Sequence, residues 1–252
     1  MKERVVGIMG AMNEEVNGVI ALVENPEETV IGRRHYYRGT INGIKVVVVF
    51  SRWGKVAAAT TVSTLINIFN ITELIFTGVA GAISDELRIG DIVIGKRLMQ
   101  HDMDSRPMMK QYEIPLDGKV FFECDPGLLS ATSSTIEKLI SDKTFNNEDL
   151  ASFHITSPRC HTGDIASGDQ FFSSSVQKDD LKSRLPSILC VEMEGAAVAQ
   201  ICYEYNIPCV VIRTISDTSD EKSPVDFQAF IQKVASFYSK KIIERMVISS
   251  KI

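Results

Sequence analysis

Residues 191–217 read VEMEGAAVAQICYEYNIPCVVIRTISD, and this stretch decides the expected fold. The small residues after Glu194 favour a helix that packs closely on a sheet, and the apolar run 209–212 is typical of a buried strand. Ligands in open α/β sheets lie beyond the carboxyl ends of strands, so Asp217 is expected at a ligand-facing edge. Alone, each acid has a structural explanation: Glu194 lies near a helix N-terminus, and Asp217 can cap a turn.

The composition is that of an ordinary globular protein, with 252 residues, 44% of them hydrophobic and 23% charged. No repeat or linker divides the chain, so one domain over residues 1–252 is expected. The net charge of −5 argues against a nucleic-acid partner, and no apolar run is long enough for a membrane span. The five scattered cysteines and the absence of a signal-like N-terminus predict a reducing, cytoplasmic location.

Predicted strands and helices alternate along the chain. Strands are expected at 4–9, 36–41, 44–50, 73–76, 89–94, 162–166 and 209–212, and helices at 13–22, 56–68, 128–140 and 226–247. Asn13 is the predicted N-cap of the first helix, and Asn42-Gly43 is the strongest hairpin signal. The alternation predicts an α/β fold with helices on both faces of a sheet.

Three irregular segments carry further expectations. The glycine-rich stretch 77–82 is interpreted as a turn that lets the backbone approach a ligand. The methionine-containing segment 101–117 is interpreted as a mobile or partner-contacting loop. Phe171 and Phe172 follow a glycine, and two explanations stay open for them: burial in the core, or an aromatic wall for a flat ligand.

Common nucleotide and hydrolase motifs are missing. Gly54-Lys55 lacks the upstream glycine and the following Ser or Thr of a phosphate loop. Val79 stands where a nucleophile elbow needs serine. No GxGxxG follows a strand, which argues against a dinucleotide-dependent oxidoreductase. The four histidines show no metal-ligand spacing, so neither a metal nor an organic cofactor is expected.

Six motifs in register from residue 10 onward resemble those of the 5′-methylthioadenosine/S-adenosylhomocysteine nucleosidases, in the nucleoside phosphorylase superfamily. The motifs are GAMNEE at 10–15, GKVA at 54–57, TGVAG at 77–81, SGDQF at 167–171, VEMEGA at 191–196 and ISD at 215–217. The resemblance implies a three-layer α/β/α sandwich around a mixed central sheet. It also implies that water cleaves the bond between adenine and a 5′-substituted ribose.

The resemblance assigns catalytic roles to three acids. Asp217 is expected to protonate adenine N7, Glu15 to activate water and Glu194 to hold the ribose hydroxyls. Glycosidic cleavage through an oxocarbenium-like transition state needs such an acid and a carboxylate near the water. Expected substrates are 5′-methylthioadenosine, S-adenosylhomocysteine and 5′-deoxyadenosine, although the sequence does not rank them.

The remaining expected contacts also follow from the resemblance. The predicted substrate-binding residues, besides Glu194, are Met12, Trp53, Val79, Gly81, Phe171, Phe172, Met193, Ser216 and Phe227. The resemblance further implies a homodimer, in which the segment 101–117 helps to close the neighbour's pocket, and a place in methionine salvage. Two positions depart from the family pattern. Trp53 stands where a smaller aliphatic residue is expected near the 5′ substituent, and the segment 105–109 has methionines and a proline where aromatic residues are expected.

Two other functions compete with hydrolysis. One is a phosphorylase of the same superfamily, and the other is a non-catalytic nucleoside-binding protein. Phosphorylases resembling this chain place an arginine where Phe76 stands, and a phosphate nucleophile needs such a fixed donor. Arg52, close to the Gly54 turn, is the alternative phosphate ligand if it reaches the site, but we expect it to point to solvent or to pair with an acid.

Overall fold

The computed structural model describes residues 3–145, 148–153, 155–219, 227 and 229–249. Its strands are β1 (Val5–Gly10), β2 (Glu24–Ile31), β3 (Arg34–Ile41), β4 (Ile44–Phe50), β5 (Glu73–Ala82), β6 (Ile92–Gln100), β7 (Phe122–Glu123), β8 (Cys160–Ser167), β9 (Ile188–Glu192) and β10 (Cys209–Asp217). Its helical segments are α1 (Asn13–Ile20), α2 (Lys55–Asn67), α3 (Pro126–Ser141), α4 (Glu148–Ser152), α5 (Ser175–Arg184), α6 (Gly195–Glu204), the π-helical turn η1 (Ile231–Ala235) and α8 (Ser236–Ser249).

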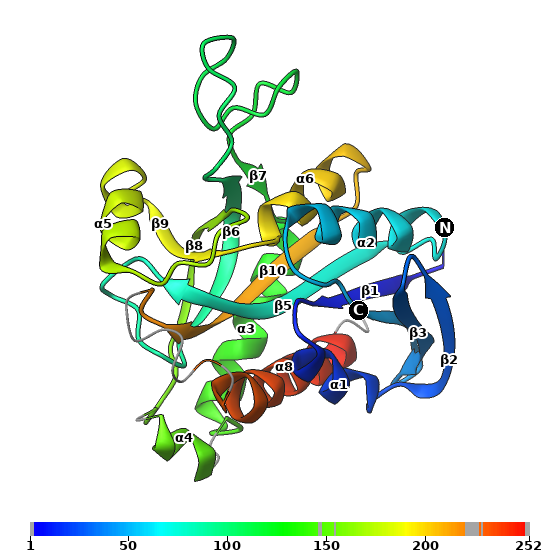
Figure 1. Cartoon of the computed structure of the whole chain (residues 1–252). Coiled ribbons are helices and arrows are strands. Elements are labelled where there is room, and N and C mark those ends of the chain that lie inside the picture. The colour runs from blue at the N-terminus through cyan, green and yellow to red at the C-terminus, as the bar shows by residue number, and fades with distance from the viewer. Residues whose placement is uncertain (1–2, 146–147, 154, 220–226, 228, 250–252) are drawn as a thin grey trace.

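All ten strands form one mixed sheet in the order β10-β6-β8-β9-β5-β1-β4-β3-β2, with β7 on β6. Strand β10 also pairs with β5, so the five strands β10, β6, β8, β9 and β5 close into a ring. The pairs β1–β4, β1–β5 and β10–β5 are parallel, whereas β5–β9 and β10–β6 are antiparallel. In Figure 1, α2 and α6 cover one side of the sheet and α1, α3 and α8 cover the other. The predicted α/β sandwich around a mixed sheet is confirmed.

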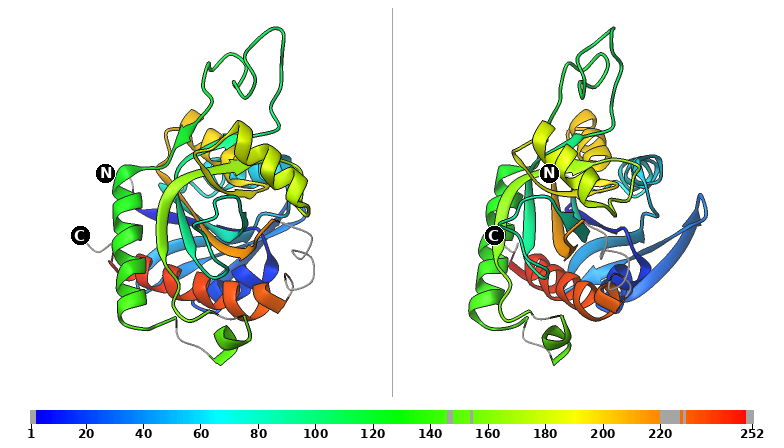
Figure 2. Two further views of the ribbon diagram at one scale, coloured as in Figure 1. Left: turned by 90° about the vertical axis from the view of Figure 1, so that its left-hand side faces the viewer. Right: turned by 60° about the vertical axis from the view of Figure 1, so that its left-hand side comes forward.

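Continuous apolar strands supply a core on each face of the sheet. Val47 and Val49 of β4 pack under α2 and α6, whereas Val46 and Val48 pack against the α1 and α8 side. Because successive side chains of a strand point to opposite faces, a strand covered on both sides must be apolar at every position. Figure 2 shows the two helical layers from other directions.

Several predicted boundaries are wrong. The stretch 77–82 is not a turn but the second half of β5, and the strand expected from 89 begins at Ile92. Met12, not Asn13, is the N-cap of α1. The helix expected from 226 has a start outside the described residues and continues as η1 and α8. The hairpin at Asn42-Gly43 is confirmed, with both residues at positive φ.

The sheet topology gathers the candidate residues at one edge. Strand β5 runs parallel to β1 and to β10, and β1 runs parallel to β4. The carboxyl ends of these four strands therefore lie at the same edge of the sheet. Asp217 ends β10 and pairs in register with Gly81 of β5. The register shifts between Ile215 and Asp217, and such a bulge redirects the side chains that follow it.

Candidate active site

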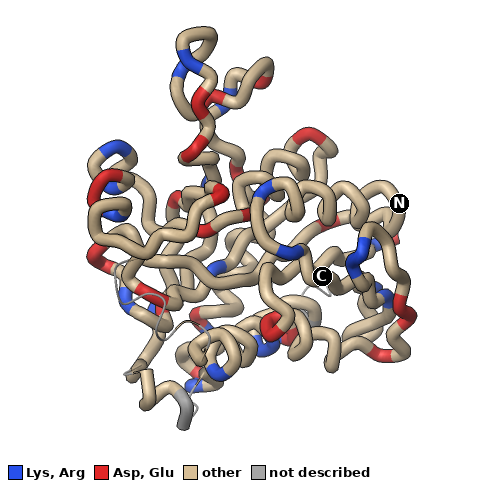
Figure 3. The backbone as a smooth tube through the Cα atoms, in the orientation of Figure 1, with Lys and Arg blue, Asp and Glu red and all other residues tan. Residues whose placement is uncertain are grey.

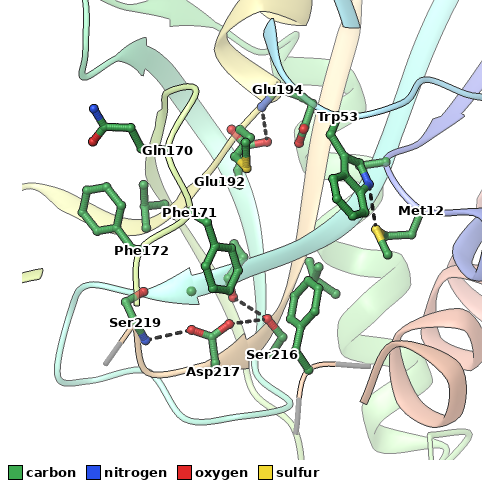
Figure 4. Close-up of a pocket in the computed structure, with 17 residues that line it drawn as sticks. Met12, Trp53, Gln170, Phe171, Phe172, Glu192, Glu194, Ser216, Asp217 and Ser219 are labelled. Carbon is green, nitrogen blue, oxygen red and sulfur yellow. Dashed lines mark hydrogen bonds between the residues drawn. The ribbon is translucent and has the colours of Figure 1, made fainter. Parts of the chain in front are cut away.

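A cavity of about 320 Å³ lies at this edge. Its wall contains eleven of the twelve predicted site residues, namely Met12, Trp53, Val79, Gly81, Phe171, Phe172, Met193, Glu194, Ser216, Asp217 and Phe227. The structure adds Ala11, Ala80, Gln170, Val191, Glu192 and Ser219. Both phenylalanines of the 171–172 pair line the cavity, and Figure 4 shows them beside Asp217. Most of the wall is apolar, as is usual for a pocket that binds a flat organic ligand.

Asp217 is held rigidly at one end of the cavity. Ser216 Oγ donates to Asp217 Oδ2 at 2.7 Å, and the Ser219 amide donates to Oδ1 at 2.8 Å (Figure 4). The expected turn cap is therefore real, but Asp217 also faces the cavity. A Cβ at position 81 would lie 2.1 Å from Ser219 Oγ and 3.0 Å from Asp217 Oδ1, so only glycine allows this approach.

Two aromatic rings form a wall near this acid. Phe171 and Phe227 meet edge to face, with their centroids 5.7 Å apart. Phe171 remains 45% exposed, so its ring is available to a ligand. The two rings touch each other, so a flat ligand has to lie against this wall and not between the rings.

Glu194 lines the cavity and is the N-cap residue of α6. Its side chain makes no capping bond to the helix, and instead Oε1 accepts a hydrogen bond from the Gly54 amide at 2.7 Å. Burial and the nearby Glu192 carboxylate raise the pKa of Glu194, while the Gly54 amide lowers it. Gly54 has φ +88, a conformation that favours glycine. The carboxylate is thus fixed by a turn from a different part of the chain.

Glu15 is the one predicted site residue that does not line the cavity. It is fully buried, and its Oε2 accepts hydrogen bonds from the amides of Ala11 and Met12, which do line it. Its Oε1 has no partner within the described part of the chain. Burial raises the pKa of Glu15 to about 8, and the nearby Glu194 adds to this rise. Glu15 therefore lies directly behind the cavity wall, with one oxygen free to bind a proton.

Sequence reasoning missed the pair formed by Glu192 and Arg213. Arg213 is fully buried, and its Nε and Nη2 donate to Glu192 Oε2 at 3.2 and 2.7 Å. Its Nη1 donates to the carbonyl oxygens of Ile212 and Phe76, and its guanidinium lies 4.1 Å from the centroid of the Phe76 ring. The position of Arg213 inside an apolar strand could have predicted this pair, because a buried charged side chain almost always has an oppositely charged partner.

Met12 and Trp53 close the end of the cavity opposite Asp217. Trp53 Nε1 donates to Met12 Sδ at 3.0 Å, and the indole is 62% exposed (Figure 4). Arg52 does not line this cavity; its Nη2 donates to the Arg33 carbonyl oxygen at 2.6 Å. In the described part of the chain, no group of three or more His, Cys, Asp or Glu side chains could hold a metal ion.

Comparison with known proteins places this geometry in a family. The model of the phosphorylase superfamily matches residues 5–247. The chain is 35% identical to a 5′-methylthioadenosine/S-adenosylhomocysteine nucleosidase of Anoxybacillus flavithermus, over 96% of this chain and 97% of the relative. It is 33% identical to an aminodeoxyfutalosine nucleosidase of Helicobacter pylori, with the same coverage. A nucleosidase structure from Colwellia psychrerythraea, in complex with adenine, superposes with a TM-score of 0.86 at 29% identity, covering 98% of this chain and 95% of that one.

Proposed function

The chain belongs to the phosphorylase superfamily, among its nucleosidases. We propose that it cleaves the N-glycosidic bond of 5′-substituted adenosines and that three carboxyl groups carry the reaction. The substrates are 5′-methylthioadenosine and S-adenosylhomocysteine, with 5′-deoxyadenosine as a further candidate. Water replaces adenine at the anomeric carbon and leaves the 5′-substituted ribose. No metal or organic cofactor takes part.

Asp217 is the acid in this proposal. Adenine leaves poorly as an anion, so a proton delivered to N7 as the bond breaks lowers the barrier. Ser216 and Ser219 hold the carboxyl group, while Phe171 and Phe227 form an aromatic wall against which the purine lies. The proton passes from the carboxyl group to N7, and the electrons of the broken bond stay on the adenine ring.

Glu194 and Glu15 act on the sugar and on water. Glu194 lines the cavity, and its free oxygen accepts hydrogen bonds from the ribose hydroxyls. Glu15 takes a proton from the attacking water through its unpartnered Oε1. A pKa of about 8 suits a base that works near neutral pH, because proton transfer is most efficient when the two are matched.

One observation favours water over phosphate as the nucleophile. Among the described residues, the cavity wall carries three carboxyl groups, those of Glu192, Glu194 and Asp217, and no lysine or arginine. Phosphate needs fixed cationic donors at the attacking face. The buried Arg213 cannot serve, because Glu192 and backbone carbonyls occupy its donors. This argues against the competing phosphorylase function.

The test is release of adenine from 5′-methylthioadenosine in phosphate-free buffer, followed by titration with phosphate. Hydrolysis gives the full rate without phosphate and methylthioribose as the second product. An absolute requirement for phosphate, with a ribose 1-phosphate product, contradicts the proposal. Binding of the nucleoside without any release of adenine would favour the non-catalytic alternative.

The proposal includes a homodimer located in the cytoplasm, where the enzyme would contribute to methionine salvage. Exposed apolar side chains support the dimer. The segment between β6 and β7 projects from the body of the molecule (Figure 1), and it carries Met108 and Leu116, which are 85% and 97% exposed. Val56 and Ile68 on α2 are also exposed. Exposed apolar patches of this kind commonly mark protein interfaces.

A further inference from the structure

The mechanism leaves one polar group beside Asp217 unused, the hydroxyl of Ser219. Ser219 is fully buried and lines the cavity, yet its Oγ has no hydrogen-bond partner among the residues that the structure describes. Buried hydroxyl groups in folded proteins almost always have a partner, and each exception requires an explanation. The position of Ser219 next to the acid supplies one.

Ser219 lies directly beside the carboxyl group of Asp217 (Figure 4). Its amide donates to Asp217 Oδ1 at 2.8 Å, so the hydroxyl of the same residue is close to this oxygen as well. Both groups lie over Gly81, because a Cβ at that position would be 2.1 Å from Ser219 Oγ and 3.0 Å from Asp217 Oδ1. Rotation about the Cα–Cβ bond of Ser219 moves the hydroxyl and leaves the amide hydrogen bond in place.

Asp217 can accept a further hydrogen bond once its proton has left. Two donors hold it at rest, Ser216 Oγ on Oδ2 and the Ser219 amide on Oδ1. A protonated carboxyl group accepts fewer hydrogen bonds than the carboxylate that it becomes. As the proton moves to N7, the electrons of the O–H bond stay on the carboxyl group, and negative charge develops next to the Ser219 hydroxyl.

We propose that Ser219 is a positioning residue for the acid, and that its hydroxyl donates to Asp217 as the carboxylate forms. No covalent bond of Ser219 is made or broken, and its proton stays on Oγ. An interaction that strengthens only as charge develops lowers the barrier, whereas one of equal strength throughout does not. The inference rests on the proposed function and adds a residue to its acid step.

The backbone at Ser219 supplies a pair of test variants. Its φ is +54, in the left-handed region that serine rarely adopts and that favours glycine. Ser219→Gly removes the hydroxyl and relieves the backbone, whereas Ser219→Ala removes the hydroxyl and keeps the unfavourable φ. Both variants retain the amide that holds Asp217. Loss of the hydroxyl is therefore common to the two variants, and the effect on the backbone is not.

With 5′-methylthioadenosine, both variants should lose about ten- to a hundredfold in kcat, the effect of one hydrogen bond to a charged group. KM should stay near its wild-type value, because the bond forms after the substrate has bound. Ser219→Gly should nevertheless unfold at a higher temperature than Ser219→Ala. A wild-type kcat in Ser219→Gly overturns the proposal, and so does a kcat that follows the melting temperature.

Tyr238 provides a matched control. Its hydroxyl is also fully buried and unpartnered within the described ranges, but Tyr238 packs in the core under α8 and does not line the cavity. Tyr238→Phe removes this hydroxyl and keeps the ring, so kcat should remain at the wild-type value. An equal loss of kcat in Tyr238→Phe contradicts the proposal, because loss of any buried hydroxyl would then have the same effect.

A second substrate assigns the effect to the acid step. The compound p-nitrophenyl 5-deoxy-5-methylthioribofuranoside releases p-nitrophenolate, a stable anion that needs no proton as it leaves. The ratio of wild-type to Ser219→Gly kcat should be large for 5′-methylthioadenosine and close to one for this compound, and equal ratios contradict the proposal. A wild-type enzyme that releases no adenine refutes the proposed function itself, whereas an active wild type matched by both variants refutes the role of Ser219 alone.

Discussion

The three carboxyl groups on the cavity wall differ in their surroundings. Glu192 accepts hydrogen bonds from the Glu194 and Gly195 amides and pairs with Arg213, so its oxygens are committed to holding α6 and the strand beside it. Glu194 makes one bond, to Gly54, and Asp217 is held by two neighbouring serines. Chemistry at the ligand is therefore assigned to Glu194 and Asp217 and not to Glu192.

The variant Glu15→Gln should lose turnover and keep nucleoside binding. Glutamine can still accept the Ala11 and Met12 amides through its oxygen, but it cannot take a proton from water. Loss of a general base typically costs about 10²–10⁴-fold in kcat. Steady-state kinetics and calorimetric titration with a substrate analogue measure the two effects. Near-normal turnover would contradict the assignment and direct attention to Glu14.

The raised pKa of Glu15 predicts a pH profile. The base must be ionised, so kcat/KM should fall as pH drops below about 8, by about tenfold per pH unit. For an unperturbed carboxyl group, that fall would begin near the ordinary value of 4.5. Initial rates between pH 5 and 9, measured at low substrate concentration, provide the check. A flat profile down to about pH 5 would show that Glu15 does not control the reaction.

The raised pKa of Glu15 also predicts that the ionised, active form of the base lowers the stability of the folded protein. The folded state holds the Glu15 proton more tightly than the unfolded state does. The stability that protonated Glu15 contributes is therefore fully present below pH 4.5 and is lost as the pH rises to about 8. Glu15→Gln should therefore unfold at a higher temperature than the wild type at pH 9, with a gain on the order of 2–4 kcal/mol. The gain should vanish near pH 4. Thermal unfolding at both pH values tests this, and an equal effect at both refutes it.

Asp217→Asn should be nearly inactive, because an amide cannot deliver an acidic proton to N7. The Ser219 amide can still donate to the new side chain, so the fold around it should persist. A substrate whose leaving base needs no protonation should recover part of the lost rate. Equal losses for both substrates would show that Asp217 positions the ligand without protonating it.

The sequence indicates which acids lie at the ligand-binding edge of the sheet, but it does not indicate whether each side chain lines the cavity or lies behind its wall. Asp217 and Glu194 were predictable because each follows an apolar strand at a place where open sheets bind ligands. The distance of Glu15 behind the wall depends on how Ala11 and Met12 fold over it, which no local pattern encodes. Likewise, the partner of Arg213 comes from a strand 21 residues earlier.

At the scale of elements, prediction fails where burial is weak. Strand β2, ENPEETVI, is exposed along nearly its whole length and is held mainly by pairing with β3, so it shows no apolar periodicity. Helix α5 buries Leu181 alone. Strand β5 is the opposite case: its glycines were expected in a turn, but pairing with β10 keeps Gly78 and Gly81 extended, and β9 also pairs with Gly81.

The turn at Gly54 and Lys55 joins three parts of the site. Its Lys55 amide donates to Asp169 Oδ1 at 2.8 Å, and Lys55 Nζ donates to Asp102 Oδ1 at 2.6 Å. Asp102 in turn accepts the Asp169 amide at 3.0 Å. The adjacent Gly54 amide holds Glu194. The turn therefore connects Glu194 to the loop that carries Phe171 and Phe172.

Lys55→Met should disturb both stability and substrate binding. It leaves Asp102, which is only 19% exposed, without its cation, a change that costs about 1–3 kcal/mol. Release of the turn should also raise KM for 5′-methylthioadenosine more than it lowers kcat. Lys55→Arg keeps the charge and should restore much of both. Thermal unfolding and kinetics of the two variants measure this, and a purely structural role would change the melting temperature and leave KM as it was.

At the scale of the whole molecule, the alternation of apolar strands and helices was enough to predict the layers. Closure of the sheet through β10 was not predictable, because it depends on pairings between strands far apart in sequence. Acidic and basic residues are interspersed along the chain (Figure 3). No helix of the described chain is both long and apolar enough to cross a membrane. A single domain over residues 1–252 stays a prediction.

The homodimer is tested by two matched substitutions. Val56 on α2 and Val176 on α5 are almost equally exposed, at 78% and 76%, but the two helices lie far apart in Figure 1. Helix α2 packs beside α6, and both helices expose apolar side chains, Val56 and Ile68 on α2 and Tyr203 on α6. A glutamate buried in an interface without a partner opposes association. Val56→Glu should therefore shift the protein toward monomers in sedimentation velocity, whereas Val176→Glu should not.

Activity decides whether this association completes the site. If the projecting segment 101–117 closes the neighbour's cavity, adenine release by Val56→Glu should fall at low protein concentration and recover as concentration rises, because mass action restores the dimer. The Val176→Glu control should show no such dependence. A wild-type protein that is monomeric at working concentration and fully active would refute the dimer. A dimer that survives Val56→Glu would instead move the interface away from α2, leaving the exposed Met108 and Leu116 as the next side chains to replace.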